Sequence, residues 1–208
     1  SGYKGPVVVA TKGIKPREMT AQEEPGAKPE HKIDPHAWQN LANGRIYVDN
    51  IAQGLSSVDP AGAAIYQANA AAYQARLAGL DQWVKTEFAA IPKAKRRLIT
   101  SHDAFGYLGA AYGVTIFSPM GVSTESEPSA GGVAQLIRQI RKEKITAVFI
   151  ENVSDPRLVQ QIGQESGVTL GGELYSDALS KPEGPAPTYI GMFKNNIPQM
   201  VAAMRKGL

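Results

Sequence analysis

The chain has 208 residues, 43% hydrophobic and 7% aromatic, enough for one large α/β domain or one domain with part of a second. Its 22 basic and 19 acidic residues are dispersed, and the densest basic run, residues 93–97 (KAKRR), lacks interleaved aromatics, so nucleic acid is not an expected partner. The absence of cysteine excludes thiolate metal sites and disulfides, and no stretch approaches the roughly 18 apolar residues of a transmembrane helix.

The first predicted element is a buried strand at residues 6–10 (PVVVA). The chain opens with Ser-Gly-Tyr and not with Met, so we expect an N-terminus that is processed or truncated. Residues 15–32 are rich in Pro, Glu and Lys and predict an exposed loop in which His31 is solvated.

Two Asp-Pro pairs predict helix starts, because Asp is a good N-cap and Pro is favoured at the first helical position. The first, Asp34-Pro35, places His36 in the first turn of a helix that runs to about residue 55. The second, Asp59-Pro60, precedes apolar residues in steps of three and four over residues 61–90. A helix of about 45 Å is longer than one small domain needs and is suited to joining two lobes.

From Arg96 onward, strand patterns alternate with helical ones. The predicted strands are residues 97–101, 114–118, 147–151 and 168–174, and the predicted helices are residues 104–112, 131–143, 156–166 and 188–206. Apolar strands that alternate with helices indicate an α/β fold with a parallel four-stranded sheet covered by helices on both faces.

Three polar residues follow the strands of this predicted sheet. His102 comes after the first strand, Glu151 ends the third, and Asp177 follows the fourth. Ligands of open parallel sheets bind beyond the carboxyl ends of the strands, so these side chains are expected at one edge, with His36 facing them across a cleft. Two histidines and one or two carboxylates suit zinc or manganese without separating the two metals.

Each of these residues also has a purely structural interpretation. His102 or Asp103 could cap the following helix, Asp177 could cap a turn, and Glu151 could pair with an arginine such as Arg157. Taken singly, these alternatives are as good as the functional ones, whereas the joint placement at one sheet edge favours a site.

A family resemblance adds to this interpretation. The segments DPHAW, SHDAFGYLGAAYG, STESEPS, ENVSDPRL and GGELYSDAL, with the long helix after the first, occur in this order from about Tyr3 onward. The order resembles bacterial substrate-binding proteins that deliver zinc or manganese to ABC importers. The resemblance implies an extracytoplasmic protein, periplasmic or on the cell surface, with two α/β lobes, a rigid linking helix and metal in the cleft between the lobes.

The resemblance also implies the ligand set. Its metal ligands correspond to His36 of DPHAW, His102 of the HDAF motif and Asp177 of the YSD motif, whereas a further histidine of the family's N-terminal lobe has no counterpart here. We therefore expect a remnant of an N-terminal lobe that permits self-association, a linking helix and a C-terminal α/β lobe, at residues 1–58, 59–92 and 93–208.

The implied function is a non-catalytic carrier that captures Zn²⁺, or alternatively Mn²⁺, and passes it to an ABC transporter permease. Residues 15–32 stand where many zinc members carry a histidine-rich insert, but contain only His31. Glu125 and Glu127, in STESEPS, are expected to cap a helix or form internal pairs instead of contacting the permease.

One alternative is a zinc-dependent hydrolase with the same ligands, in which Glu151 activates a metal-bound water. The sequence has no HExxH motif, nucleophile elbow or phosphate loop that would support catalysis.

Overall fold

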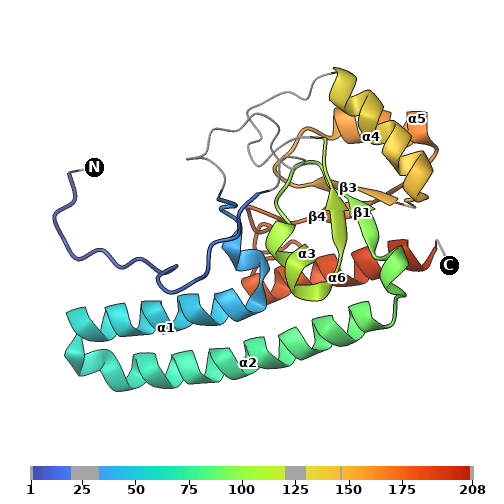
Figure 1. Cartoon of the computed structure of the whole chain (residues 1–208). Helices are drawn as coiled ribbons and strands as arrows, with labels where there is room; N and C mark the ends of the chain where they lie inside the picture. Colours follow the sequence, from blue (N-terminus) through green and yellow to red (C-terminus); the bar gives the residue numbers. More distant parts are fainter. Residues whose placement is uncertain (1, 20–32, 120–129, 146, 207–208) are drawn as a thin grey trace.

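The computed structural model describes residues 2–19, 33–119, 130–145 and 147–206 (Figure 1). Within them, the helices are α1 (Leu41–Val58), α2 (Ala63–Ala89), α3 (Gly106–Tyr112), α4 (Ala130–Glu143), α5 (Pro156–Ser166) and α6 (Tyr189–Arg205), and the strands are β1 (Arg97–Ile99), β2 (Thr115–Phe117), β3 (Ala147–Glu151) and β4 (Thr169–Leu174). Figure 1 shows α1 and α2 side by side below the sheet, with α4 and α5 on its other side.

The sheet confirms the predicted α/β fold. Its strand order is β2-β1-β3-β4 and all pairs are parallel. The chain moves from β1 outward to β2 and then returns to β3 on the other side of β1. The strand order therefore reverses between β1 and β3, and in open α/β sheets the crevice at such a reversal is the usual ligand position.

Alternate residues of the central strands pack into two separate apolar clusters. Leu98 and Phe149 pack in the cluster that contains the buried faces of α2, α3 and α6. Ile99 and Val148 pack in the cluster formed with α4 and α5. Because both faces of β1 and β3 are covered, the segments that leave their carboxyl ends begin from a rigid base.

The long helix is confirmed, with a short 3₁₀ turn at its start. The side chain of Asp59 accepts a hydrogen bond from the backbone N–H of Gly62, in the 3₁₀ turn Pro60–Gly62, and α2 follows directly. Buried residues of its second half, including Val84 and Phe88, belong to the same cluster as α6, whereas its first half packs against α1.

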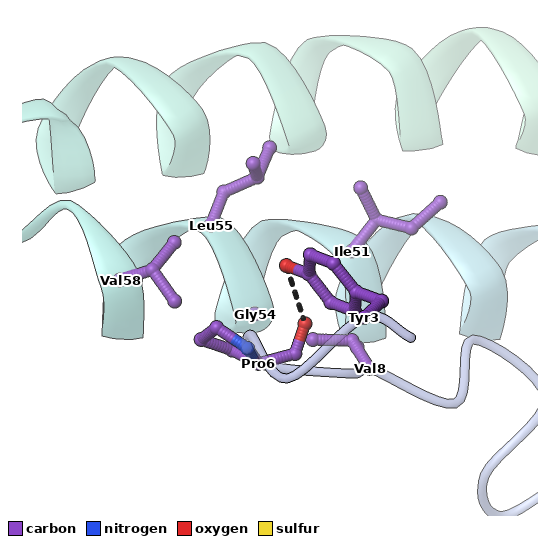
Figure 2. Close-up of a pocket in the computed structure, with 7 residues that line it drawn as sticks. All are labelled: Tyr3, Pro6, Val8, Ile51, Gly54, Leu55 and Val58. Carbon is purple, nitrogen blue, oxygen red and sulfur yellow. Dashed lines mark hydrogen bonds between the residues drawn. The ribbon is translucent and has the colours of Figure 1, made fainter. Parts of the chain in front are cut away.

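The strand predicted at residues 6–10 is wrong. These residues form no strand, and the side chain of Val7 is 78% exposed. Figure 2 shows Tyr3, Pro6 and Val8 lying against α1 beside Ile51, Leu55 and Val58. An apolar β-branched run needs a neighbouring strand to complete its hydrogen bonds, and none of the four strands in the described chain lies beside this segment.

Two predicted helix starts are also wrong. No helix begins at Pro35: His36 precedes a short 3₁₀ helix, Ala37–Gln39, and α1 begins at Leu41 with Asn40 as its side-chain N-cap. Asp103 does not cap α3, because the N-cap position is Phe105. In both places the acidic side chain is buried close to the candidate site.

Two groups of residues considered in the sequence fall beyond the part that the structure describes, namely His31 and the STESEPS segment with Glu125 and Glu127. Among the helices that the structure does describe, none combines the length and the apolar character needed to cross a membrane.

Candidate metal centre

His102 is held by the end of the neighbouring strand. It follows β1, and its backbone N–H donates to Oε1 of Glu151, the last residue of β3, over 2.9 Å. The second oxygen of Glu151, Oε2, lies 2.8 Å from His102 Nδ1, and both side chains are completely buried. One carboxylate thus fixes the backbone and the ring of His102, and directs Nε2 away from the sheet.

His36 is held in the same way by a residue close in sequence. Oδ1 of Asp34 accepts the backbone N–H of His36 over 2.9 Å and lies 2.8 Å from His36 Nδ1. The Asp34 side chain is completely buried. The ring of His36 also packs edge-on against Trp38, with centroids 5.4 Å apart.

Asp177 lies in the connection from β4 to α6, whose backbone is held on both sides. Asn196 on α6 accepts from the backbone N–H of Tyr175 and donates to its carbonyl. The carbonyl of Ser176 accepts hydrogen bonds from the side chains of Trp38 and Gln39. The 3₁₀ helix after His36 is therefore bonded directly to the connection that carries Asp177.

The three side chains converge on one point. Asp177 Oδ2 lies 3.1 Å from His102 Nε2, and Asp177 Oδ1 lies 3.5 Å from His36 Nε2. One potential ligand atom from each residue lies within 4.8 Å of the others. The histidines are sealed from solvent, whereas the Asp177 side chain is 33% exposed, so the point is reached from the side of Asp177.

The carboxylates favour the charged form of both histidines. Burial alone would lower the pKa of His36, but its hydrogen bonds to Asp177 and Asp34 outweigh burial and raise the pKa to about 9. Burial likewise opposes a charged His102, yet Asp177 and Glu151 raise its pKa to about 10. For Asp177, burial favours the neutral acid, and the two histidines reverse this and hold its pKa well below the usual range.

This arrangement is typical of metal sites. A histidine that ligates a metal usually has its other ring nitrogen held by a carboxylate or carbonyl, which fixes the ring and strengthens the ligand. Both histidines here have that partner on Nδ1, which leaves both Nε2 atoms and Asp177 for a cation. Two nitrogens and a carboxylate suit a borderline divalent ion such as zinc or manganese.

Glu151 does not occupy the position of a general base. It contacts the ring nitrogen of His102 that faces away from Asp177, and its side chain has no exposed surface. It does not pair with Arg157 either, because Arg157 pairs with Asp155 at the start of α5.

Sequence reasoning missed the role of Asp34, which it assigned to a helix cap. A carboxylate two residues before a histidine is a weak signal, because the same Asp-Pro pair at Asp59 does cap a helical turn. The contribution of Asn196 carries no signal in the sequence, since it depends on how α6 packs beside β4.

Comparison with known proteins gives a consistent family. A family model described as zinc-uptake complex component A, periplasmic, matches residues 1–203. The chain is 35% identical over 181 residues to the iron ABC transporter substrate-binding lipoprotein MtsA of Streptococcus pyogenes, covering 87% of this chain and 58% of the relative. It is 32% identical over 197 residues to the manganese ABC transporter substrate-binding lipoprotein PsaA of Streptococcus pneumoniae, covering 95% of this chain and 62% of that relative.

Solved structures agree with these matches. A manganese-bound mutant of a periplasmic metal binding protein from Candidatus Liberibacter asiaticus superposes with a TM-score of 0.83 at 30% identity, covering 95% of this chain and 71% of that one. The periplasmic zinc binding protein TroA from Treponema pallidum gives 0.81 at 33% identity, covering 86% and 66%. The chain therefore belongs to the family of periplasmic zinc-uptake component A proteins, and it spans about 58% of the length of its relative MtsA.

Proposed function

We propose that this chain is the metal-binding part of an extracytoplasmic carrier that captures a divalent transition metal and delivers it to an ABC transporter permease. The observation that carries the proposal is the convergence of two histidines, each held at Nδ1 by a buried carboxylate, on the exposed Asp177. The names of the relatives MtsA and PsaA, which are substrate-binding lipoproteins of ABC transporters, support the transport role and a location in the periplasm or on the cell surface.

The proposed ligands are His36 Nε2, His102 Nε2 and a carboxylate oxygen of Asp177. They supply three of the four donors of a tetrahedral zinc site, so the fourth is a water or a side chain from outside the described residues. In this proposal His36 belongs to one lobe, the other two ligands belong to a second lobe at residues 93–208, and the helix within residues 59–92 links the two.

Zinc is the first candidate for the cargo and manganese the second. The donor set accommodates both, and zinc binds a given nitrogen and oxygen site more tightly than manganese. Relatives named for iron, manganese and zinc show that this family does not have a single cargo. Competition between Zn²⁺ and Mn²⁺ for the purified protein, followed by calorimetry, measures the preference directly.

A carrier is favoured over the hydrolase alternative by the position of Glu151. The hydrolase needs a carboxylate beside the metal-bound water, and Glu151 is instead buried on the opposite side of the His102 ring.

Self-association stays a prediction. It is supported by the exposed apolar side chains of Ile51, Leu55 and Val58 on α1, which line a pocket with Val8. Sedimentation of the purified chain over a range of concentrations measures it, and a monomer at all concentrations would contradict it.

Metal titration of site variants tests the proposed function. His102→Ala and Asp177→Ala should each weaken Zn²⁺ binding strongly, whereas Asp155→Ala, at an exposed ion pair on α5, should leave it unchanged. Elemental analysis of the protein as purified should find a stoichiometric transition metal. Wild-type affinity in both site variants would overturn the ligand assignment.

A further inference from the structure

Arg17 holds Asp34, the residue whose carboxylate contacts Nδ1 of His36, by two separate contacts. Its backbone carbonyl accepts the N–H of Asp34 over 2.9 Å, and its guanidinium donates from Nη1 to Asp34 Oδ2, also over 2.9 Å. The next residues, Glu18 and Ile33, form an antiparallel β-bridge. Residues 17–18 are thus paired with residues 33–34, and the side chain of Arg17 contacts Asp34 at one end of this pairing.

The same residue is attached to the other half of the site. The backbone N–H of Arg17 donates to the hydroxyl of Tyr107 over 2.7 Å. Tyr107 is the second residue of α3, which begins four residues after His102. Arg17 therefore connects the carboxylate that orients His36 with the helix that follows His102.

The start of α3 also packs closely against this ion pair. A Cβ atom added at Gly106, the first residue of α3, would lie 2.4 Å from Nη1 of Arg17 and 2.6 Å from Oδ2 of Asp34. The Asp34 side chain is completely buried and that of Arg17 is only 20% exposed. The ion pair therefore lies directly against the start of α3, where any larger residue would displace it.

We propose that Arg17 is a positioning residue for metal capture, which fixes Asp34 against His36 Nδ1 and sets the distance between His36 and His102. This inference rests on the proposed function, because it takes those histidines as the ligands. Arg17 acts through Asp34 and does not touch the cation. Loss of an outer-shell partner such as Asp34 typically weakens metal binding about 10- to 100-fold, and removal of Arg17 should approach this range by releasing Asp34.

Arginine and lysine differ in how they can direct a donor at Asp34. A guanidinium is planar, and its donors are held in a fixed fork, so that Nη1 can be directed at the carboxylate. An ammonium on a flexible stem provides charge without this direction. Arg17→Lys should therefore recover only part of the affinity lost in Arg17→Ala.

The experiment compares three variants of the whole chain: Arg17→Ala, Arg17→Lys and Gly106→Ala. Zn²⁺ affinity is measured by competition with a chelator, and the coordination of Co²⁺ is followed by its visible absorption. We expect Arg17→Ala and Gly106→Ala to weaken Zn²⁺ binding about 10- to 100-fold, with an altered Co²⁺ spectrum. Arg157→Ala, at an arginine that is 87% exposed on α5, is the matched control and should bind like wild type.

Gly106→Ala separates positioning from general stability. Alanine favours a helix more than glycine does, and the change removes no polar group, so a purely structural role for this region predicts unchanged metal affinity. Weakened binding with an unchanged unfolding midpoint of the metal-free protein supports the inference, and this variant decides the question even if Arg17→Ala fails to fold.

Two results overturn the inference in distinguishable ways. If His102→Ala abolishes binding while Arg17→Ala and Gly106→Ala bind like wild type, Arg17 is not a positioning residue and the proposed function stands. If His102→Ala itself binds like wild type, the ligand assignment fails and the inference fails with it.

Discussion

The two histidines of the site have similar partners but very different supports. His102 is fixed from within the sheet, because its carboxylate partner, Glu151, comes from the next strand, 49 residues away in sequence. His36 is fixed by Asp34, two residues before it, and Asp34 is fixed in turn by the loop residue Arg17. One half of the site is therefore part of the core of the α/β fold, and the other is a set of polar contacts between loops.

This difference separates binding from stability. Changes on the His102 side should affect both, since Glu151 and His102 lie between the two central strands. Changes on the His36 side should affect mainly the metal, because that part contributes few apolar contacts to the core.

The largest effects are expected from removal of either histidine. His102→Ala and His36→Ala should each weaken Zn²⁺ binding by more than about 100-fold, which is the upper end of the range for an outer-shell partner. His102→Ala should also lower the free energy of unfolding by about 1–3 kcal/mol or more, because it leaves the buried Glu151 without its ring partner. Calorimetric titration measures the loss of Zn²⁺ affinity, and urea unfolding measures the loss of stability. Equal stability losses for the two variants would contradict the proposed difference between the His102 side and the His36 side.

Metal affinity should rise steeply with pH. Since His36 and His102 have pKa values of about 9 and 10, a cation must displace a proton from each at neutral pH. Affinity should therefore increase about 100-fold per pH unit between pH 6.5 and 8.5, tenfold for each proton. Calorimetry in buffers of different ionisation enthalpy should find two protons released per metal, and release of none at pH 7.5 would contradict histidine ligation.

Stability of the metal-free protein should change with pH in the opposite direction. A histidine whose pKa is raised in the folded state contributes stability that is present below its unfolded value of about 6.5 and is lost as pH rises through its folded value. The window here extends from about 6.5 to about 10. Urea midpoints with a chelator present should decrease from pH 6.5 to pH 10, and His102→Ala should show a smaller decrease.

The carboxylates that contact Nδ1 of the two histidines allow a second comparison of the two sides of the site. Asp34→Asn and Glu151→Gln should each weaken metal binding about 10- to 100-fold. Only Glu151→Gln should clearly lower the unfolding midpoint, because the backbone hydrogen bond that Glu151 accepts joins the ends of β1 and β3, whereas the one that Asp34 accepts comes from His36, only two residues away. Thermal unfolding of both metal-free variants would detect the difference, and a larger loss in Asp34→Asn would reverse the comparison.

The smallest effect is expected far from the site. Val7 is exposed on the segment that lies along α1, so Val7→Ser should change stability by no more than about 0.5 kcal/mol and leave Zn²⁺ affinity unchanged. A clear loss of affinity, measured in the same titration, would show that the N-terminal segment supports the site.

The sequence predicted the α/β half of the molecule well because its elements have strong periodic signals. Residues 147–151 and 156–166 match β3 and α5 to the residue, and the parallel order alone was enough to place His102, Glu151 and Asp177 at one edge. His36 is expected to face them from the preceding segment, and the family resemblance adds its role as a ligand.

The sequence failed where a local pattern depends on its surroundings. The run PVVVA has the composition of a strand, but a strand exists only with a partner, and the described chain provides none beside it. Asp34-Pro35 has the composition of a helix start, yet a buried contact with Arg17 and His36 determines its conformation. Tertiary contacts, which no local signal encodes, decided both.

The raised pKa values of the two histidines have a consequence for the charge of the site. In the metal-free protein at neutral pH, the protonated rings of His36 and His102 carry two positive charges beside the buried carboxylates. In the proposed function, a divalent cation brings the same charge as the two protons that it displaces, so its binding leaves the net charge of the site unchanged. A trivalent cation would raise that net charge by one, and a monovalent cation would lower it by one.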